Sequence, residues 1–223
     1  VTPVPLEDVP AEVPSRIGAT GNDGHPLRSV LADAGDVQLV GVSDQEDGIA
    51  LFEDAVVQTT GTGANAGDIV MNGTGGPSAV ATGADGISVG NFVSNMLMVT
   101  TVDGNILLEG AATWGSGVAF NRGAISSIGM GDVTLMGTAT TANGRNGVGV
   151  AGPVSTDSGT LTITGSSTGT GSSFIRGVSI TDPVTSTTGE IAITGSSVNT
   201  NGVFIAGSGT VVSTGGTTGI SIT

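Results

Sequence analysis

Apolar and polar residues alternate with a period of two inside a seven-residue unit that recurs along the chain. Each copy begins and ends with glycine and has apolar residues at its third and fifth positions, as in GDVTLMG (131–137) and GEIAITG (189–195). This period is typical of a β-strand with one buried face. The first glycines of the six copies lie 27 to 37 residues apart and are Gly35, Gly67, Gly104, Gly131, Gly159 and Gly189.

Two further short apolar stretches follow each copy. The second stretch comes directly after a glycine, as in GVAF (117–120), and a weaker third stretch comes after that, as in AISSI (124–128). GISI (219–222), near the end of the chain, is interpreted as another copy of the second stretch. One unit therefore has about thirty residues and three short strands, separated by turns rich in Gly, Asn, Ser and Thr.

Such a unit cannot bury its apolar side alone, but it can do so when it is stacked on copies of itself. Each strand then pairs with the equivalent strand of the next coil, about 4.8 Å away. The sequence therefore predicts an all-β, right-handed parallel β-helix of about six to seven coils over residues 35–223. The glycines are expected to supply positive-φ corners between the faces. An antiparallel sandwich also has short strands, but it gives no reason for three strand types in a fixed cyclic order.

Residues 1–34 differ from the rest and are predicted to form a separate region. VTPVPLEDVPAEVP (1–14) has four prolines, which favour an extended arm. HPLRSVLADAG (25–35) predicts one short helix that begins at Pro26 and stops at Gly35. The arm and the helix would together form a small cap on the first coil.

The stretch GDVTLMGTATTANGRNGVGVAGPVSTDSGTLTITG (131–165) resembles the repeats of large secreted bacterial adhesins of the filamentous-haemagglutinin type. The resemblance covers residues 35–223 at the level of the repeats. The secretion-domain motifs that this family carries at its N-terminus are not recognisable in residues 1–34. The resemblance implies an extracellular, right-handed β-helical rod used in adhesion or in surface structure.

The charge balance limits the kinds of molecule that the chain is expected to bind. Five Lys and Arg residues stand against 19 Asp and Glu residues, so the net charge is -14. A chain with this balance is not expected to bind nucleic acid or anionic lipid, because it neutralises few phosphates. It has no cysteine, which excludes disulfides and thiolate metal sites, and no apolar run long enough to predict a membrane span.

The second position of the seven-residue unit carries a column of mostly acidic residues when the coils are stacked. Its members are Asp36, Asp68, Asn105, Asp132, Thr160 and Glu190. One interpretation places Ca²⁺ between the carboxylates of Asp36, Asp68 and Asp132, because hard cations bind oxygen ligands. The other interpretation is that each side chain accepts a hydrogen bond from a nearby backbone amide at the corner. No other cofactor is expected.

Two sets of apolar residues are predicted to need a cover. Val40, Val70, Leu107 and Met136 face outward from the first four copies of the unit, where the N-terminal arm, the insertion at 91–103 or a neighbouring molecule would pack on them. The chain also stops in mid-repeat, which would leave Ile220 and Ile222 on an open sheet edge. Either further repeats of a longer chain or another copy of the chain is expected to stack there.

These features favour a secreted structural or adhesive fibre element at a bacterial cell surface: a rod, a stalk or a self-assembling filament subunit, and not an enzyme. Its expected partners are copies of itself or further repeats, with surface glycans or host receptors as ligands. The alternative is a carbohydrate-active enzyme, because polysaccharide lyases and hydrolases also use this fold. Such an enzyme should have a groove with converging acids and exposed rings. Arg122, Arg145 and Arg176 lie in turns of successive coils and need not converge.

Overall fold

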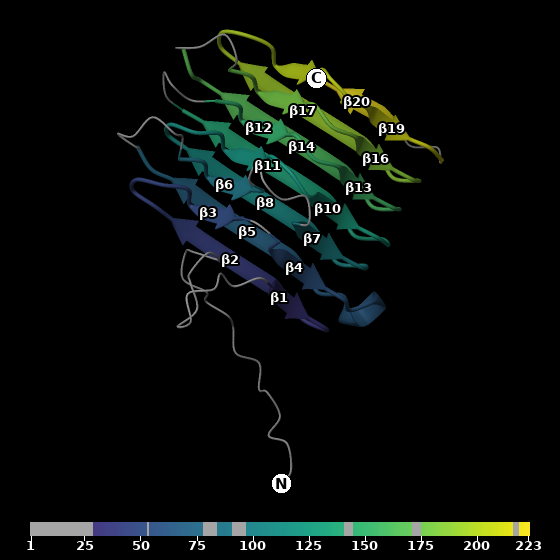
Figure 1. The fold of residues 1–223 in the computed structure, drawn as a ribbon. Coiled ribbons are helices and arrows are strands. Elements are labelled where there is room, and N and C mark those ends of the chain that lie inside the picture. The colour runs from purple at the N-terminus through teal and green to yellow at the C-terminus, as the bar shows by residue number, and fades with distance from the viewer. Residues whose placement is uncertain are drawn as a thin grey trace.

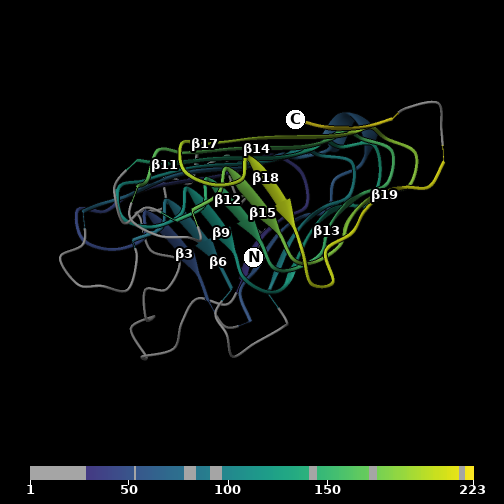
Figure 2. The same cartoon turned by 90° about the horizontal axis from the view of Figure 1, so that it is seen from above.

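The protein is an all-β parallel β-helix, as the repeat pattern predicts. The computed structural model describes residues 29–52, 54–77, 84–90, 97–140, 145–170, 175–215 and 219–223. Three parallel sheets run the length of the rod, and the chain passes through each of them once per coil (Figure 1). Viewed from the C-terminal end, the sheets enclose a common interior from three sides (Figure 2).

The seven-residue units form the first sheet, in which each inner strand pairs in parallel with its equivalents in the coils before and after it. Val133 lies beside Ile106 on one side and beside Leu161 on the other. In order across the sheet the strands are β2 (Val37–Val42), β5 (Ile69–Gly75), β8 (Ile106–Ala112), β11 (Val133–Ala139), β14 (Leu161–Ser167), β17 (Ile191–Ser197) and β20 (Ile220–Ile222).

The second and third apolar stretches form the other two sheets. The second sheet contains β3 (Ile49–Leu51), β6 (Ile87–Val89), β9 (Val118–Phe120), β12 (Val148–Val150), β15 (Val178–Ile180) and β18 (Val203–Ile205). The third sheet contains β1 (Ser29–Ala32), β4 (Val56–Thr59), β7 (Met98–Thr101), β10 (Ala124–Ser127), β13 (Val154–Thr156), β16 (Val184–Ser186) and β19 (Val211–Ser213). A 3-10 turn, η1 (Gly63–Asn65), lies between β4 and β5.

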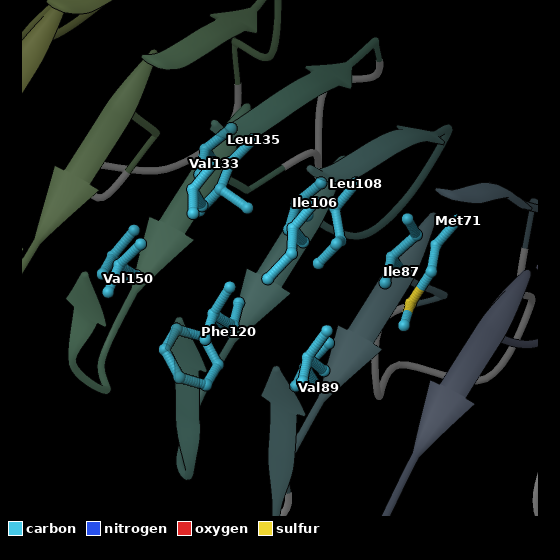
Figure 3. Close-up of a cluster of buried hydrophobic side chains, with 14 of the residues drawn as sticks. Met71, Ile87, Val89, Ile106, Leu108, Phe120, Val133, Leu135 and Val150 are labelled. Carbon is cyan, nitrogen blue, oxygen red and sulfur yellow. The ribbon is translucent and has the colours of Figure 1, made fainter. Parts of the chain in front are cut away.

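The core is a set of aliphatic columns that run along the rod axis. Inward side chains of the first and second sheets meet in the shared interior, where Leu108 and Phe120 are fully buried (Figure 3). Because the strands are in register, inward aliphatic residues stack on apolar residues of the next coil, as Leu108 stacks on Leu135. Each coil thus buries its apolar face against its neighbours, which no coil could do alone.

One interior column is polar. The last inward position of the third sheet carries Thr59, Thr101, Ser127, Thr156 and Ser186, all buried. Their hydroxyl groups bond to the glycines that open the seven-residue units. Thr59 Oγ1 donates to the carbonyl of Gly67 at 2.6 Å, and Thr101 Oγ1 donates to that of Gly104 at 2.6 Å. Burying these hydroxyls costs little because each has a backbone partner, and the bond holds the corner between the third and first sheets.

Two different constraints select glycine at the corners. The expected positive φ occurs between the second and third sheets, at Gly90 after β6 and Gly123 before β10. The glycines that open and close the seven-residue units are instead required by close backbone approach. Among the opening glycines of the units, only Gly35 has a positive φ. A Cβ atom on Gly131 would lie less than 3 Å from the carbonyl oxygen of Gly104 in the preceding coil. A Cβ atom on Gly110, which closes its unit, would overlap the carbonyl oxygen of Gly117 in the same way.

Two further expectations are wrong for the described residues. Ser29–Ala32 does not belong to a helix over 25–35. It forms strand β1, which pairs with β4 in the third sheet. The β-helix therefore begins before the predicted boundary at Gly35. The segment Ile220–Ile222 pairs with β17 and so belongs to the first sheet, not the second. The predicted arm and the start of the predicted helix, at residues 1–28, lie outside the described residues.

Replacing Gly110 by alanine should destabilise the rod by about 2 kcal/mol or more, because the backbone must move to admit the methyl group. Gly149 is the matched control, since a Cβ atom there would meet only Asn146 Nδ2, at 3.4 Å. Gly149→Ala should be neutral or stabilise by up to about 1 kcal/mol. Urea unfolding followed by circular dichroism measures both, and equal effects of the two substitutions would contradict the close-approach argument.

Candidate functional site

The predicted acidic column exists, and it forms a ladder of hydrogen bonds along one corner of the rod. Asp36 Oδ1 accepts the backbone N–H of Asp68 at 2.9 Å, and Asp68 Oδ1 accepts that of Asn105 at 2.7 Å. Asn105 Oδ1 accepts the N–H of Asp132 at 2.8 Å, and Asp132 Oδ1 accepts that of Thr160 at 2.7 Å. Each side chain therefore ties its own coil to the next.

This ladder accounts for Asp36, Asp68 and Asp132 without a metal. Asparagine takes the same role at position 105, which shows that the hydrogen bond needs an acceptor oxygen and not a charge. In the part of the chain that the structure describes, no group of three or more His, Cys, Asp or Glu side chains is arranged to hold a metal ion. Calcium between these carboxylates stays a prediction.

The outward apolar residues of the first sheet lie on its outer face, but they do not form one continuous strip. Val70 and Leu107 are half-buried and adjacent to each other in the register. Val40 and Met136 are exposed and lie in the other outward row, beside Asn72 and Glu109 respectively. Polar side chains therefore interrupt the face. Residues 91–96, the first part of the insertion expected to cover it, lie outside the described residues, and Met98–Thr101 forms strand β7.

The last coil exposes its core. Ile220 and Ile222 are 44% and 47% exposed, whereas Ile191 and Ile193, which lie one coil earlier in the same columns, are fully buried. The last strands of the second and third sheets also expose core residues, since Val203 and Val211 are only partly buried. We call this surface, made of Val203, Ile205, Val211, Ile220 and Ile222, the open end.

A hollow of about 420 Å³ lies on the outer face of the second sheet. Its floor is formed by the outward residues of four consecutive strands, and these are all small: Ser88, Ala119, Gly149 and Ser179. The coil spacing makes this floor about 14 Å long, parallel to the rod axis. The next strand places Phe204 beside Ser179, and the guanidinium of Arg176 stacks over that ring, 3.7 Å from its centroid.

The two walls of the hollow differ in chemistry. Residues just before the strands supply one wall, which is polar and charged: Asp47, Asp85, Ser116, Arg145 and Asn146. Residues just after the strands supply the other wall: Phe52, Gly90, Asn121, Ala151 and Thr181. Arg145 therefore lines the hollow, Arg176 stacks on Phe204, and Arg122 is not among the lining residues. The three arginines do not converge on one point.

The polar wall contains a second ladder of the same kind as the first. The backbone N–H of Asp85 donates to Asp47 Oδ1 at 2.7 Å, and that of Ser116 donates to Asp85 Oδ1 at 2.7 Å. Two coils further on, the N–H of Arg176 donates to Asn146 Oδ1 at 3.2 Å. Backbone pairing between coils thus fixes where both carboxyl groups sit.

Burial perturbs both carboxyl groups. Desolvation, helped by the nearby charges of Asp85 and Glu46, raises the pKa of Asp47 from 3.8 to about 6, against the hydrogen bonds from the Asp85 amide and the Ser88 hydroxyl. Desolvation also raises the pKa of Asp85, against the hydrogen bond from the Ser116 amide and the positive charge of Arg145. Perturbed carboxyl groups at the wall of a cavity are typical of functional sites.

Sequence reasoning missed this hollow. Its signal is present in the residue before each second-strand glycine, which is acidic in DGIAL (47–51) and DGISV (85–89) but not in the later coils. The other half of the signal is the small residue at the middle of the second strands from β3 to β15, which gives way to Phe204 in β18. Neither pattern shows from the sequence alone that a cavity lies above the sheet.

Comparisons with known proteins give no relative: no family model, curated protein or solved structure matches the chain. Nothing in them identifies filamentous-haemagglutinin-type repeats. Within the described residues, no helix has the length and apolar character needed to cross a membrane. The proposals below therefore rest on this chain's own geometry.

Asp132→Asn should leave the stability of the rod unchanged within about 0.5 kcal/mol, because the amide oxygen can still accept the Thr160 N–H. Asp132→Ala should cost about 1 kcal/mol, because that amide loses its acceptor. Thermal unfolding in EDTA and in millimolar CaCl₂ measures both variants. A melting temperature that rises with calcium in the wild type, but not in Asp132→Asn, would instead establish the metal column.

Asp47→Asn should flatten the dependence of stability on pH. A carboxyl group whose pKa is higher in the folded state stabilises the fold fully below pH 4 and loses that contribution as pH rises towards 6. At pH 7 the variant should therefore be more stable than the wild type by about 1 kcal/mol, a figure reduced for partial solvent exposure. Urea unfolding at pH 4 and pH 7 measures the difference, and parallel pH profiles for the two proteins would contradict it.

Proposed function

We propose that the protein is a structural or adhesive rod element of a bacterial cell surface, secreted to the cell exterior. Its mechanical role follows from the fold: hydrogen-bond ladders run parallel to the axis in all three sheets, and two side-chain ladders reinforce the corners. Stretching or bending the rod would strain many of these bonds at once. The strongly acidic surface, with a net charge of -14, favours solubility outside the cell.

The open end is the observation that supports this role most directly. Its side chains occupy columns whose members in earlier coils are fully buried, as Ile180 and Val184 are. The strands β18, β19 and β20 are edge strands, so their outer backbone groups can pair with a further coil. We infer that a further coil covers this end, supplied by additional repeats of a longer chain or by another copy.

The other end of the rod is different. The inward side chains of β2 and β3, such as Val37 (6% exposed) and Leu51 (fully buried), are covered although these strands are also at the edge of their sheets. In β1, Val30 and Ala32 are only partly buried, so the exposed core at this end is confined to the third sheet. An isolated chain should therefore associate chiefly through its open end.

Ile222→Glu should abolish self-association of the isolated chain, because it places a charge in an apolar contact between ends. Met130→Glu is the control, since Met130 is also exposed but lies on the flank of the rod. Sedimentation velocity and negative-stain microscopy measure the assembly. Two results would contradict a role for the open end: a wild-type chain that stays monomeric at about 100 μM, or an Ile222→Glu variant that assembles to the same extent as the wild type.

A carbohydrate-active enzyme is the second candidate function, and the hollow favours it. The hollow brings two carboxyl groups with raised pKa, Asp47 and Asp85, together with the exposed ring of Phe52. Acids near a sugar-sized cavity can act as general acid and base. Release of reducing ends from polysaccharides by the wild type, and its loss in Asp85→Asn, would distinguish this function from a purely structural one.

A further inference from the structure

We propose that the hollow on the second sheet is a binding site for a short, neutral oligosaccharide lying along the rod axis. The proposal goes beyond the rod function and does not depend on self-association or on turnover. It rests on the shape of the floor, on the two different walls and on the retention of two carboxyl groups where an amide would serve the fold.

The floor provides a channel suited to a linear ligand. Four consecutive coils place small side chains at the same position, from Ser88 to Ser179. A longer side chain at any of these positions would project into the hollow. The next coil carries Phe204 at the same position, beyond the residues that line the hollow. The volume of about 420 Å³ lies within the range of small-molecule sites.

The walls match the two kinds of surface that a sugar presents. Sugar hydroxyl groups donate and accept, and the polar wall offers acceptors at Asp47 and Asp85 and donors at Arg145 and Asn146. The opposite wall carries the Phe52 side chain, 42% exposed, which can contact the apolar C–H face of a sugar ring.

The two carboxyl groups lower the stability of the fold relative to an amide at the same positions. Asn146 fills the ladder position of Asp47 and Asp85 two coils later and accepts the Arg176 N–H through its amide oxygen. Aspartates at 47 and 85 add a charge that burial opposes, and the positive charge of Arg145 offsets this only in part at Asp85. A site that keeps such groups at a cost in stability is explained by a ligand that uses them.

Other occupants fit less well. An anionic chain would meet two carboxyl groups, with Arg145 already facing Asp85. A peptide strand could not add to the sheet here, because the backbone groups of β6, β9, β12 and β15 already pair with neighbouring coils. A neutral, hydroxyl-rich ligand meets neither obstacle.

The test is titration of the isotope-labelled chain with neutral hexasaccharides (cello-, laminari-, manno-, xylo- and chitohexaose) and with hexagalacturonate as the anionic probe. Calorimetry and amide chemical shifts report binding. We expect at least one neutral hexasaccharide to bind with a Kd between about 1 μM and 1 mM, and to shift the amides of Ala119, Gly149 and Ser179. Hexagalacturonate should bind at least about tenfold more weakly.

Gly149→Phe supplies the steric test, because the position has room for a side chain that then projects over the floor. It should weaken binding at least about tenfold, whereas Ser155→Phe, on the outer face of the third sheet in the same coil, should change it less than about twofold. No binding by any neutral hexasaccharide, shifts confined to other faces, or unchanged binding by a folded Gly149→Phe would overturn the proposal. The shift map of the wild type decides the question even if that variant does not fold.

Discussion

Close approach of the backbone at stacked corners is the constraint on which the rest of the structure depends. At the corner where the third sheet meets the first, each coil lies directly against the carbonyl of the glycine below it, as Gly131 lies against Gly104. Only a residue without a side chain fits there, so glycine recurs once per coil in register. That register aligns the inward aliphatic residues in columns and lets three narrow sheets share one core.

Polar groups at the corners then complete the stacking. The buried hydroxyl of Thr59 or Thr101 bonds to the opening glycine, while side-chain oxygens on the two outer ladders bond to the coil that follows. Because the ladder needs only an acceptor oxygen, the chain can place Asp or Asn along it without changing the fold. This freedom lets two coils carry buried carboxyl groups at the hollow while other coils carry amides. The same repeat thus provides both the rod and a local site on its flank.

The period-two pattern predicted the first sheet and its columns, because alternation depends only on which face of a strand is buried. The reason for the glycines that open and close the units could not be predicted, since a sequence shows that glycine recurs but not how near two backbones pass. The pattern G-I-x-I at Gly219 has the glycine spacing of the second strand, so the spacing alone gave the wrong sheet. The cyclic order of the strands, which places a first-sheet strand after β19, gives the right one. In the sequence, Leu27, Val30 and Leu31 stand at i, i+3 and i+4, which is helical spacing. Pairing of Ser29–Ala32 with β4 outweighs it. The hollow depends on side-chain sizes across four coils, which no single repeat displays.

Disulfide trapping of adjacent coils tests the stacking most directly, because the chain has no cysteine of its own. Thr134 and Thr162 lie side by side on the paired strands β11 and β14. The spacing of neighbouring strands, about 4.8 Å, falls within the range of Cα–Cα distances that a disulfide can join. The account predicts that Thr134→Cys with Thr162→Cys forms an intramolecular disulfide in the folded monomer, and that Thr134→Cys with Ala192→Cys, two coils apart, does not. A disulfide in the second pair but not in the first would contradict the parallel β-helix.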